Sequence, residues 1–159
     1  MRSTGSQGEA EGTPAAPPPA ASRLLIEHVT PAIDGGRYPI KRILGEACEV
    51  GADILRDGHD VLTGRIVFRG PGDCTWHHAP LTYDYDRDRW SGAFLPTRIG
   101  RWTYTIEAWT DRFGTWRRTL ATRLDAGRDV HLDLVEGAAL LTAAAEHATG
   151  EARAALRRV

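Results

Sequence analysis

The chain has 159 residues, enough for one domain, and its formal net charge is −1. This balance excludes the large basic excess that is typical of nucleic-acid-binding proteins. No stretch approaches the ~20 apolar residues of a membrane span, and the first residues lack the basic start and apolar run of a secretory signal. We therefore expect a cytoplasmic protein that binds neither nucleic acid nor membrane. Its two cysteines are too few for a disulfide framework.

Residues 1–22 differ in composition from the rest of the chain. They are rich in Gly, Ser, Ala and Pro and contain almost no large apolar side chains. Such a segment buries too little surface to offset its chain entropy. We expect a disordered tail.

From residue 23 to residue 125, apolar residues recur with a period of two, which predicts strands. Gly, Pro and Asp turns separate the strands. The predicted strands are 24–29, 48–54, 61–69, 76–85, 89–95, 100–110 and 115–124. About seven short strands over about a hundred residues predict a mostly β protein, an immunoglobulin-like antiparallel β-sandwich.

After Asp125 the apolar residues recur at steps of three and four, which predicts an amphipathic helix starting between residues 127 and 132. Thr149 and Gly150 interrupt it, and helical composition resumes from Glu151. An Ala/Leu helix face of this length needs a packing partner. We therefore expect residues 126–159 to be the truncated start of a helical segment.

The segment 31–42 contains two glycines, two prolines and three cations around Tyr38, namely Arg37, Lys41 and Arg42. One interpretation is a rigid loop that binds a partner surface, a phosphate or sugar hydroxyls. The alternative is a surface crossover between the sheets that happens to be basic. The Gly-Gly pair lacks the spacing and following helix of a phosphate-binding loop. We favour a docking or structural role.

Two other polar clusters predict neither a catalytic site nor a metal site. Asp57 and Asp60 flank His59 at an expected hairpin tip, where solvated carboxylates are poorly suited to acid–base catalysis. Cys74, together with His77 and His78, lacks the second ligand pair of a closed zinc site. The sequence predicts no catalytic residue, no cofactor and no metal site.

Two tryptophans near the end of the β region are candidate contact residues. A four-residue turn over 111–114 would place Trp109 opposite Trp116 across a strand pair. An exposed aromatic pair suits an interface or sugar stacking. We favour packing at an interface and keep sugar stacking as the alternative, with Trp90 and Trp102 filling the core.

Five segments together carry a resemblance to a known family. They are IEHVTP (26–31), DGGRYPIKR (34–42), GE (45–46), DILRDGHD (53–60) and EAWTDRFGTW (107–116). From about Arg23 onward, the chain resembles the N-terminal domain of the α-1,4-glucan:maltose-1-phosphate maltosyltransferases. The tail before Arg23 is not covered.

The resemblance implies a function. Complete enzymes of this family combine an N-terminal β-sandwich, a helical insertion, an α-amylase-type barrel and a C-terminal β domain. They transfer maltose from α-maltose 1-phosphate to the non-reducing end of α-1,4-glucan, with retention. The two carboxylates that retention requires lie in the barrel, so no catalytic residue carries over to this chain.

The family's homodimer uses the N-terminal domain together with the barrel. The resemblance therefore implies a non-catalytic dimerisation and scaffold domain, with a second copy and the enzyme's own barrel as partners. We expect its contact residues to include Arg37, Tyr38, Lys41, Arg42, Trp109 and Trp116. The alternatives are an independent α-glucan-binding module and a stand-alone interaction protein.

Overall fold

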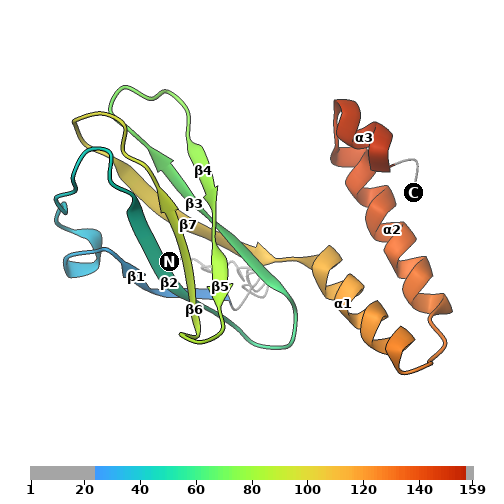
Figure 1. Cartoon of the computed structure of the whole chain (residues 1–159). Coiled ribbons are helices and arrows are strands. Elements are labelled where there is room, and N and C mark those ends of the chain that lie inside the picture. The colour runs from blue at the N-terminus through green and yellow to red at the C-terminus, as the bar shows by residue number, and fades with distance from the viewer. Residues whose placement is uncertain (1–23, 157–159) are drawn as a thin grey trace, which may run out of the picture.

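The computed structural model of the protein describes residues 24–156, so the tail predicted for residues 1–22 lies outside the described residues. Over residues 24–156, seven strands form two antiparallel sheets and three helices follow them (Figure 1). The fold is therefore the predicted mostly β, immunoglobulin-like sandwich followed by a helical segment. Within this range, no helix combines the length and the apolar character needed to span a membrane.

The two sheets contribute four and three strands. The first has the order β1 (Leu24–Thr30), β2 (Cys48–Arg56), β6 (Arg89–Phe94) and β5 (Thr82–Asp84). The second has the order β4 (His77–Pro80), β3 (Leu62–Arg69) and β7 (Thr103–Thr110). Alternate residues of each strand point inward, and the buried core consists of Cys48, Val50, Ala52, Ile54, Ile66, Leu81, Phe94 and Ile106. Trp90 and Trp102 pack against this core and are partly buried.

The single strand expected over 76–85 is two strands in different sheets. The chain leaves the second sheet after Pro80 and enters the first sheet at Thr82, so β4 and β5 close one side of the sandwich. Leu81, between them, is buried, and its N–H donates to the carbonyl of Gly64 over 3.1 Å. Gly92 makes the crossing possible, because a β-carbon at this position would overlap the carbonyl oxygen of Pro80.

The strand predicted over 115–124 is wrong. These residues lie in a helix, α1 (Arg112–Asp125), which follows β7 almost without a break. Asp111 caps this helix, since its carboxylate accepts a 2.7 Å hydrogen bond from the N–H of Gly114. The helical part of the chain thus begins at Arg112, earlier than the sequence indicated.

Two further helices complete the described chain, α2 (His131–His147) and the short α3 (Gly150–Leu156). Both agree with the predicted helix and its resumption after Gly150. α1 and α2 form a hairpin at one end of the sandwich (Figure 1). β2 and β3 lie in different sheets, so the hairpin expected at residues 57–60 is wrong and this segment crosses between the sheets. The start of α1 is tied to the end of this crossing, because the N–H of Val61 donates to the Thr115 hydroxyl over 2.8 Å. In addition, the N–H of Asp111 donates to the Val61 carbonyl over 2.8 Å.

We expect Gly92→Ala to destabilise the sandwich by about 1–3 kcal/mol, the usual cost of overpacking a core. The added methyl group would meet the Pro80 carbonyl and the side chains of Ile66 and Leu81. Urea unfolding measures the effect. Ser91→Ala is the control, because Ser91 is exposed on the same strand and should change stability by less than about 0.5 kcal/mol. Equal stability of Gly92→Ala and the native chain would contradict this account of the crossing.

Candidate functional site

The segment between β1 and β2 forms a compact loop. It contains a turn of 3-10 helix, η1 (Asp34–Gly36), closed by an isolated bridge between Ile33 and Tyr38. Gly35 and Gly36 have φ values of 61° and 89°, the unusual backbone angles expected of the pair. The Arg37 guanidinium lies 5.6 Å from the centre of the Tyr38 ring and 3.8 Å from the Asp34 carboxylate. We call residues 31–44 the η1 loop.

The η1 loop borders a groove of about 1320 Å³ on the open side of the sandwich, between the edge strands β1 and β7. Arg37, Tyr38 and Arg42 all line it, whereas Lys41 is exposed and does not. Thus the structure brings three of the four predicted loop residues to one groove. Its other walls are largely apolar and include Ile43, Leu44, Phe94, Ile99, Trp102, Tyr104 and Ile106.

Specific contacts hold the η1 loop in place. The Tyr104 hydroxyl, from β7, donates to the Pro31 carbonyl over 2.6 Å. Burial raises the pKa of Tyr104, and the nearby Cys48 adds to this while Arg42 opposes it, so the phenol keeps the proton that it donates. At the far end of the loop, the N–H of Gly45 donates to the Pro96 carbonyl over 3.1 Å. The loop is therefore anchored at both ends.

A polar network fixes the end of β1 that leads into this loop. Arg89 donates to the Asp53 carboxylate over 2.9 Å, to the His28 carbonyl over 2.7 Å and to the Thr30 hydroxyl over 2.9 Å. The Asp53 carboxylate also contacts Nδ1 of His28 at 2.7 Å. The register of β1 against β2 shifts between Glu27 and Thr30. Arg89 bridges the residues on either side of this irregularity and so sets the direction in which the loop departs.

The structure separates Trp109 from Trp116. Trp109 pairs with Thr63 across the β7–β3 ladder and is 44% exposed. Trp116 lies in α1, where its indole packs against Gly137 of α2 and its N–H donates to the Asp133 carbonyl over 2.5 Å. The prediction that the two face each other across strands is therefore wrong, because the segment that carries Trp116 is helical.

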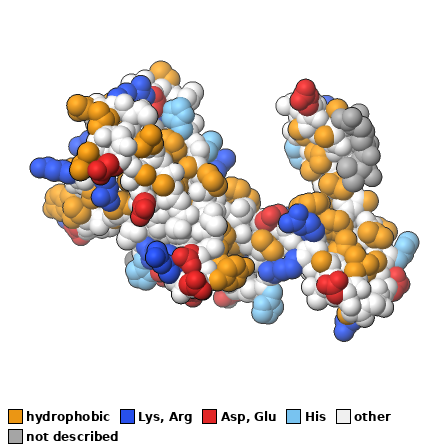
Figure 2. All heavy atoms as spheres, viewed as in Figure 1, with side chains coloured by type: hydrophobic (Ala, Val, Ile, Leu, Met, Phe, Trp, Pro, Cys, Tyr) orange, Lys and Arg blue, Asp and Glu red, His pale blue; other side chains and the backbone are white. Residues whose placement is uncertain are grey.

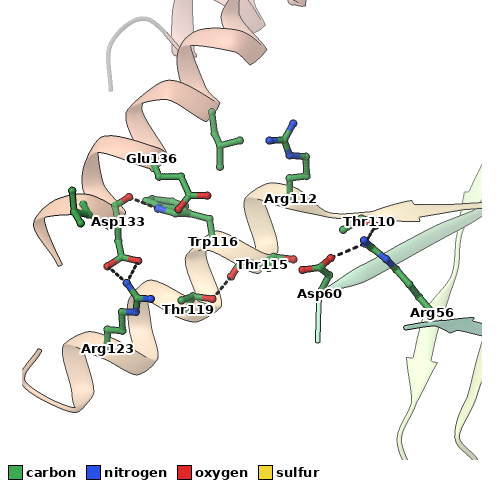
Figure 3. Close-up of a pocket in the computed structure, with 12 residues that line it drawn as sticks. Arg56, Asp60, Thr110, Arg112, Thr115, Trp116, Thr119, Arg123, Asp133 and Glu136 are labelled. Carbon is green, nitrogen blue, oxygen red and sulfur yellow. Dashed lines mark hydrogen bonds and ion pairs between the residues drawn. The ribbon is translucent and has the colours of Figure 1, made fainter. Parts of the chain in front are cut away.

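Trp116 also borders a second hollow, of about 490 Å³, between the sandwich and the helical hairpin (Figure 3). On the sandwich side, Arg56 binds the Asp60 carboxylate at 2.7 Å and the Thr110 hydroxyl. On the helix side, Arg123 of α1 binds both carboxylate oxygens of Asp133 at 2.7 Å. A single guanidinium nitrogen, Nη1 of Arg123, donates to both oxygens, and because Asp133 is only 5% exposed this ion pair fastens α1 to α2 beside the indole.

The structure places on the same sheet face as Trp109 a residue that sequence reasoning did not select, Trp76. Trp76 precedes β4, is 42% exposed and lies under the Arg69 guanidinium, 4.5 Å from its ring centre. Trp109 has a similar neighbour in Arg65, at 5.6 Å. Only the β3–β4 register reveals that both indoles lie on the outer face of one sheet, and the sequence contained no signal for that register.

Asp73 holds the turn that precedes Trp76. Its carboxylate accepts a 2.7 Å hydrogen bond from the N–H of Gly70, pairs with Arg98 and lies 3.3 Å from Nε2 of His77. The Gly70 N–H is the largest influence lowering the pKa of Asp73; Arg98 and His77 add to it, and burial opposes it. Asp73 therefore joins two loops as an anion. Within residues 24–156, no group of three or more His, Cys, Asp or Glu is arranged to hold a metal ion.

The fold and these surfaces define the chain as an immunoglobulin-like sandwich fused to a helical hairpin, with a hollow at each end of the sandwich. Residues 22–159 match the family model described as α-1,4-glucan:maltose-1-phosphate maltosyltransferase, domain N/S. This match covers most of the chain, and the chain belongs to that family.

Individual relatives agree with the family match. The chain is 46% identical over 129 residues to the α-1,4-glucan:maltose-1-phosphate maltosyltransferase of Myxococcus xanthus, with 79% of this chain and 19% of the relative covered. It is 41% identical over 129 residues to the enzyme of that name from Chlorobaculum tepidum, with 81% and 19% covered. It is 40% identical over 146 residues to that from Rhodospirillum rubrum, with 86% and 21% covered. The chain thus spans about a fifth of the length of the curated relatives it matches.

We expect Gly137→Ala to loosen the helical hairpin. Alanine favours a helix interior over glycine by about 1 kcal/mol, but here the methyl group would overlap the Trp116 indole. The steric effect should dominate, lower the thermal midpoint and shift the indole N–H resonance of Trp116. Ala139→Gly is the control, because Ala139 is exposed on the same helix: it should cost about 1 kcal/mol by propensity and leave that resonance unchanged. An unshifted resonance in Gly137→Ala would contradict the packing described here.

We expect Asp73→Asn to make stability less dependent on acid pH. The folded-state pKa of Asp73 is lowered, so its contribution is present above the unfolded value of about 4 and is lost as the pH falls through the folded value. The variant should have a lower urea midpoint at pH 7, and the difference should shrink below about pH 4. Asp86→Asn, at an exposed turn, should show no such trend. A constant difference across this range would be inconsistent with an anionic role.

Proposed function

We propose that this chain is the N-terminal, non-catalytic dimerisation and scaffold domain of a cytoplasmic maltosyltransferase, an enzyme that moves maltose from α-maltose 1-phosphate onto the non-reducing end of α-1,4-glucan. The observation that carries the proposal is the match of residues 22–159 to domain N/S of that family. The relatives that share it are about five times longer than the matched region.

The surface of the chain supports an assembly role. Hydrophobic side chains gather over the helical hairpin and at the opposite end of the sandwich, where Figure 1 places the η1 loop (Figure 2). Monomeric proteins rarely expose contiguous apolar patches of this kind unless they bind a partner. The exposed apolar residues at the loop end are Ile33, Tyr38, Ile43, Leu44, Leu95 and Ile99, and those on α2 are Leu132, Leu134 and Val135.

We assign the η1 loop groove to contact with the second subunit. Tyr38 and Arg37 are of the residue types enriched at interface centres. The loop is anchored at both ends by Tyr104 and Gly45, so a partner would meet a surface that is already ordered. Binding then requires little loss of backbone entropy.

The carboxylates of the sandwich support a non-catalytic role. A retaining transfer needs one carboxylate that attacks the sugar and a second that gives up a proton. Asp53, Asp73 and Asp133, the least exposed of the ion-paired carboxylates, are each bound by an arginine. A guanidinium bound to a carboxylate occupies the oxygens that would otherwise approach a sugar carbon. These groups are therefore suited to holding loops and helices together.

The proposal is tested by a chimera in which residues 22–159 replace the matching region of the Myxococcus xanthus enzyme. The chimera should be dimeric by sedimentation and should release phosphate from α-maltose 1-phosphate when glucan is present. Tyr38→Ala should weaken the dimer by about 2 kcal/mol, roughly a 30-fold rise in its dissociation constant.

Tyr85→Ala is the matched control for the chimera, because Tyr85 is an exposed tyrosine on the β5–β6 turn, away from the groove. It should leave the dimer unchanged. A chimera that folds but stays monomeric would contradict the dimerisation role. Phosphate release from α-maltose 1-phosphate by the 159-residue chain alone would contradict the non-catalytic role.

A further inference from the structure

The outer face of the β4–β3–β7 sheet is a flat platform whose side chains follow from the strand register. On β7 it presents Thr103, Thr105, Glu107 and Trp109, and their partners on β3 are Arg69, Val67, Arg65 and Thr63. On β4, His78 lies beside Val67 and Pro80 beside Arg65. Trp76 immediately precedes β4 and lies against Arg69, the residue that follows Phe68 on β3. The two tryptophans therefore occupy diagonally opposite corners.

Arginines set the orientation of both indoles. Arg65 lies over Trp109 and Arg69 over Trp76, with guanidinium carbons 5.6 Å and 4.5 Å from the ring centres. Such contacts fix a planar side chain that would otherwise rotate. Both rings still keep more than two fifths of their surface exposed. Each corner thus carries a fixed, amphipathic aromatic surface that is accessible to a ligand.

The spacing of the corners suits an extended ligand. Trp109 pairs with Thr63 and Trp76 lies at Arg69, which places them six residues apart along β3, about 20 Å at ~3.3 Å per residue. A single sugar ring cannot reach both indoles, whereas a chain of several glucosyl units can. The platform between them offers the hydroxyls of Thr63, Thr103 and Thr105 for hydrogen bonds.

The charge of the platform indicates an uncharged ligand. Arg65 pairs with Glu107 at 2.7 Å, which leaves the Arg69 guanidinium over the Trp76 ring as a single net positive charge among the residues named on this face. The central apolar residue, Val67, is only 5% exposed because its neighbours on the sheet already cover it. A protein partner needs an apolar centre to bury, which this face does not provide. Polar groups with little net charge between two exposed aromatic rings match a neutral polyhydroxyl chain.

We propose that this outer face, with Trp76 and Trp109 as stacking residues, is a binding surface for α-1,4-glucan chains. The choice of α-1,4-glucan over other neutral polysaccharides rests on the proposed function. The apolar faces of successive glucosyl units stack on the two indoles, and the threonine hydroxyls and Glu107 bind sugar hydroxyls between them. None of Trp76, Trp109, Arg65 and Arg69 lines the η1 loop groove, whereas Thr103 and Thr105 of β7 do, so the two surfaces adjoin along β7 and differ in their aromatic residues.

Affinity electrophoresis of the 159-residue chain in gels containing glycogen tests the proposal. Gels containing dextran, an α-1,6-linked glucan, are the negative control. Glycogen should retard the native chain and dextran should not. Trp76→Ala and Trp109→Ala should each weaken binding roughly tenfold, and the double variant should migrate as it does without polysaccharide. Quenching of native tryptophan fluorescence by maltoheptaose provides a measurement that requires no variant.

Tyr38→Ala is the control, since it removes an exposed aromatic from the η1 loop and should leave glycogen binding unchanged. The proposal is overturned if glycogen fails to retard the native chain, if the double variant is retarded as strongly, or if dextran retards as well as glycogen. It is also overturned if Trp76→Ala and Trp109→Ala dissociate the chimeric dimer, because the face would then be a protein interface. If the 159-residue chain fails to bind glycogen while the chimera is dimeric and active, this inference alone is refuted and the proposed function stands.

Discussion

The crossing of the chain between the two sheets at Leu81 is the constraint on which the rest of the architecture depends. Leu81 can be buried there only because Gly92 lets the Pro80 backbone approach β6. The crossing closes one side of the sandwich with β4 and β5, so the opposite side, between β1 and β7, stays open. The η1 loop lies at this open side, where it borders the groove of about 1320 Å³. A single close backbone approach therefore determines where the sandwich is closed and where it can accept a partner.

A second set of contacts determines where the helices begin and how they pack. Asp111 caps α1, and the Thr115 hydroxyl accepts a hydrogen bond from the N–H of Val61, just before β3, so the helix starts directly at the end of β7. Trp116 then fills the space above Gly137, and Arg123 binds the buried Asp133. A buried ion pair contributes little net stability, although removing one of its partners is costly. The main effect of these contacts is therefore to hold α2 in one orientation against α1. The pocket in Figure 3 is a consequence of that orientation.

The sequence predicted the sandwich well because alternation in strands such as β2 is a local signal that packing only has to follow. It failed over residues 115–124, where Thr and Trp favour strands by propensity. Two helix signals were present there: Asp111 as a cap, and the apolar residues Phe113, Trp116, Leu120 and Leu124 at steps of three and four. The η1 loop residues were identified from composition alone. Trp76 was missed for a different reason, since its partner across the sheet depends on a register that no local pattern encodes.

The two proposed surfaces have different chemistry, and this allows them to act together. The η1 loop groove has largely apolar walls and is suited to a protein, whereas the outer sheet face has the Arg65–Glu107 ion pair and exposed indoles and is suited to a neutral sugar chain. Neither Trp76 nor Trp109 lines the groove, so a dimer formed through it would leave both indoles accessible on each subunit. Glycogen-type glucans carry many chain ends, so two weak faces joined in one particle would bind with greater avidity than either alone. Dimerisation would then do more than hold subunits together, because it would keep the enzyme close to the polymer it extends.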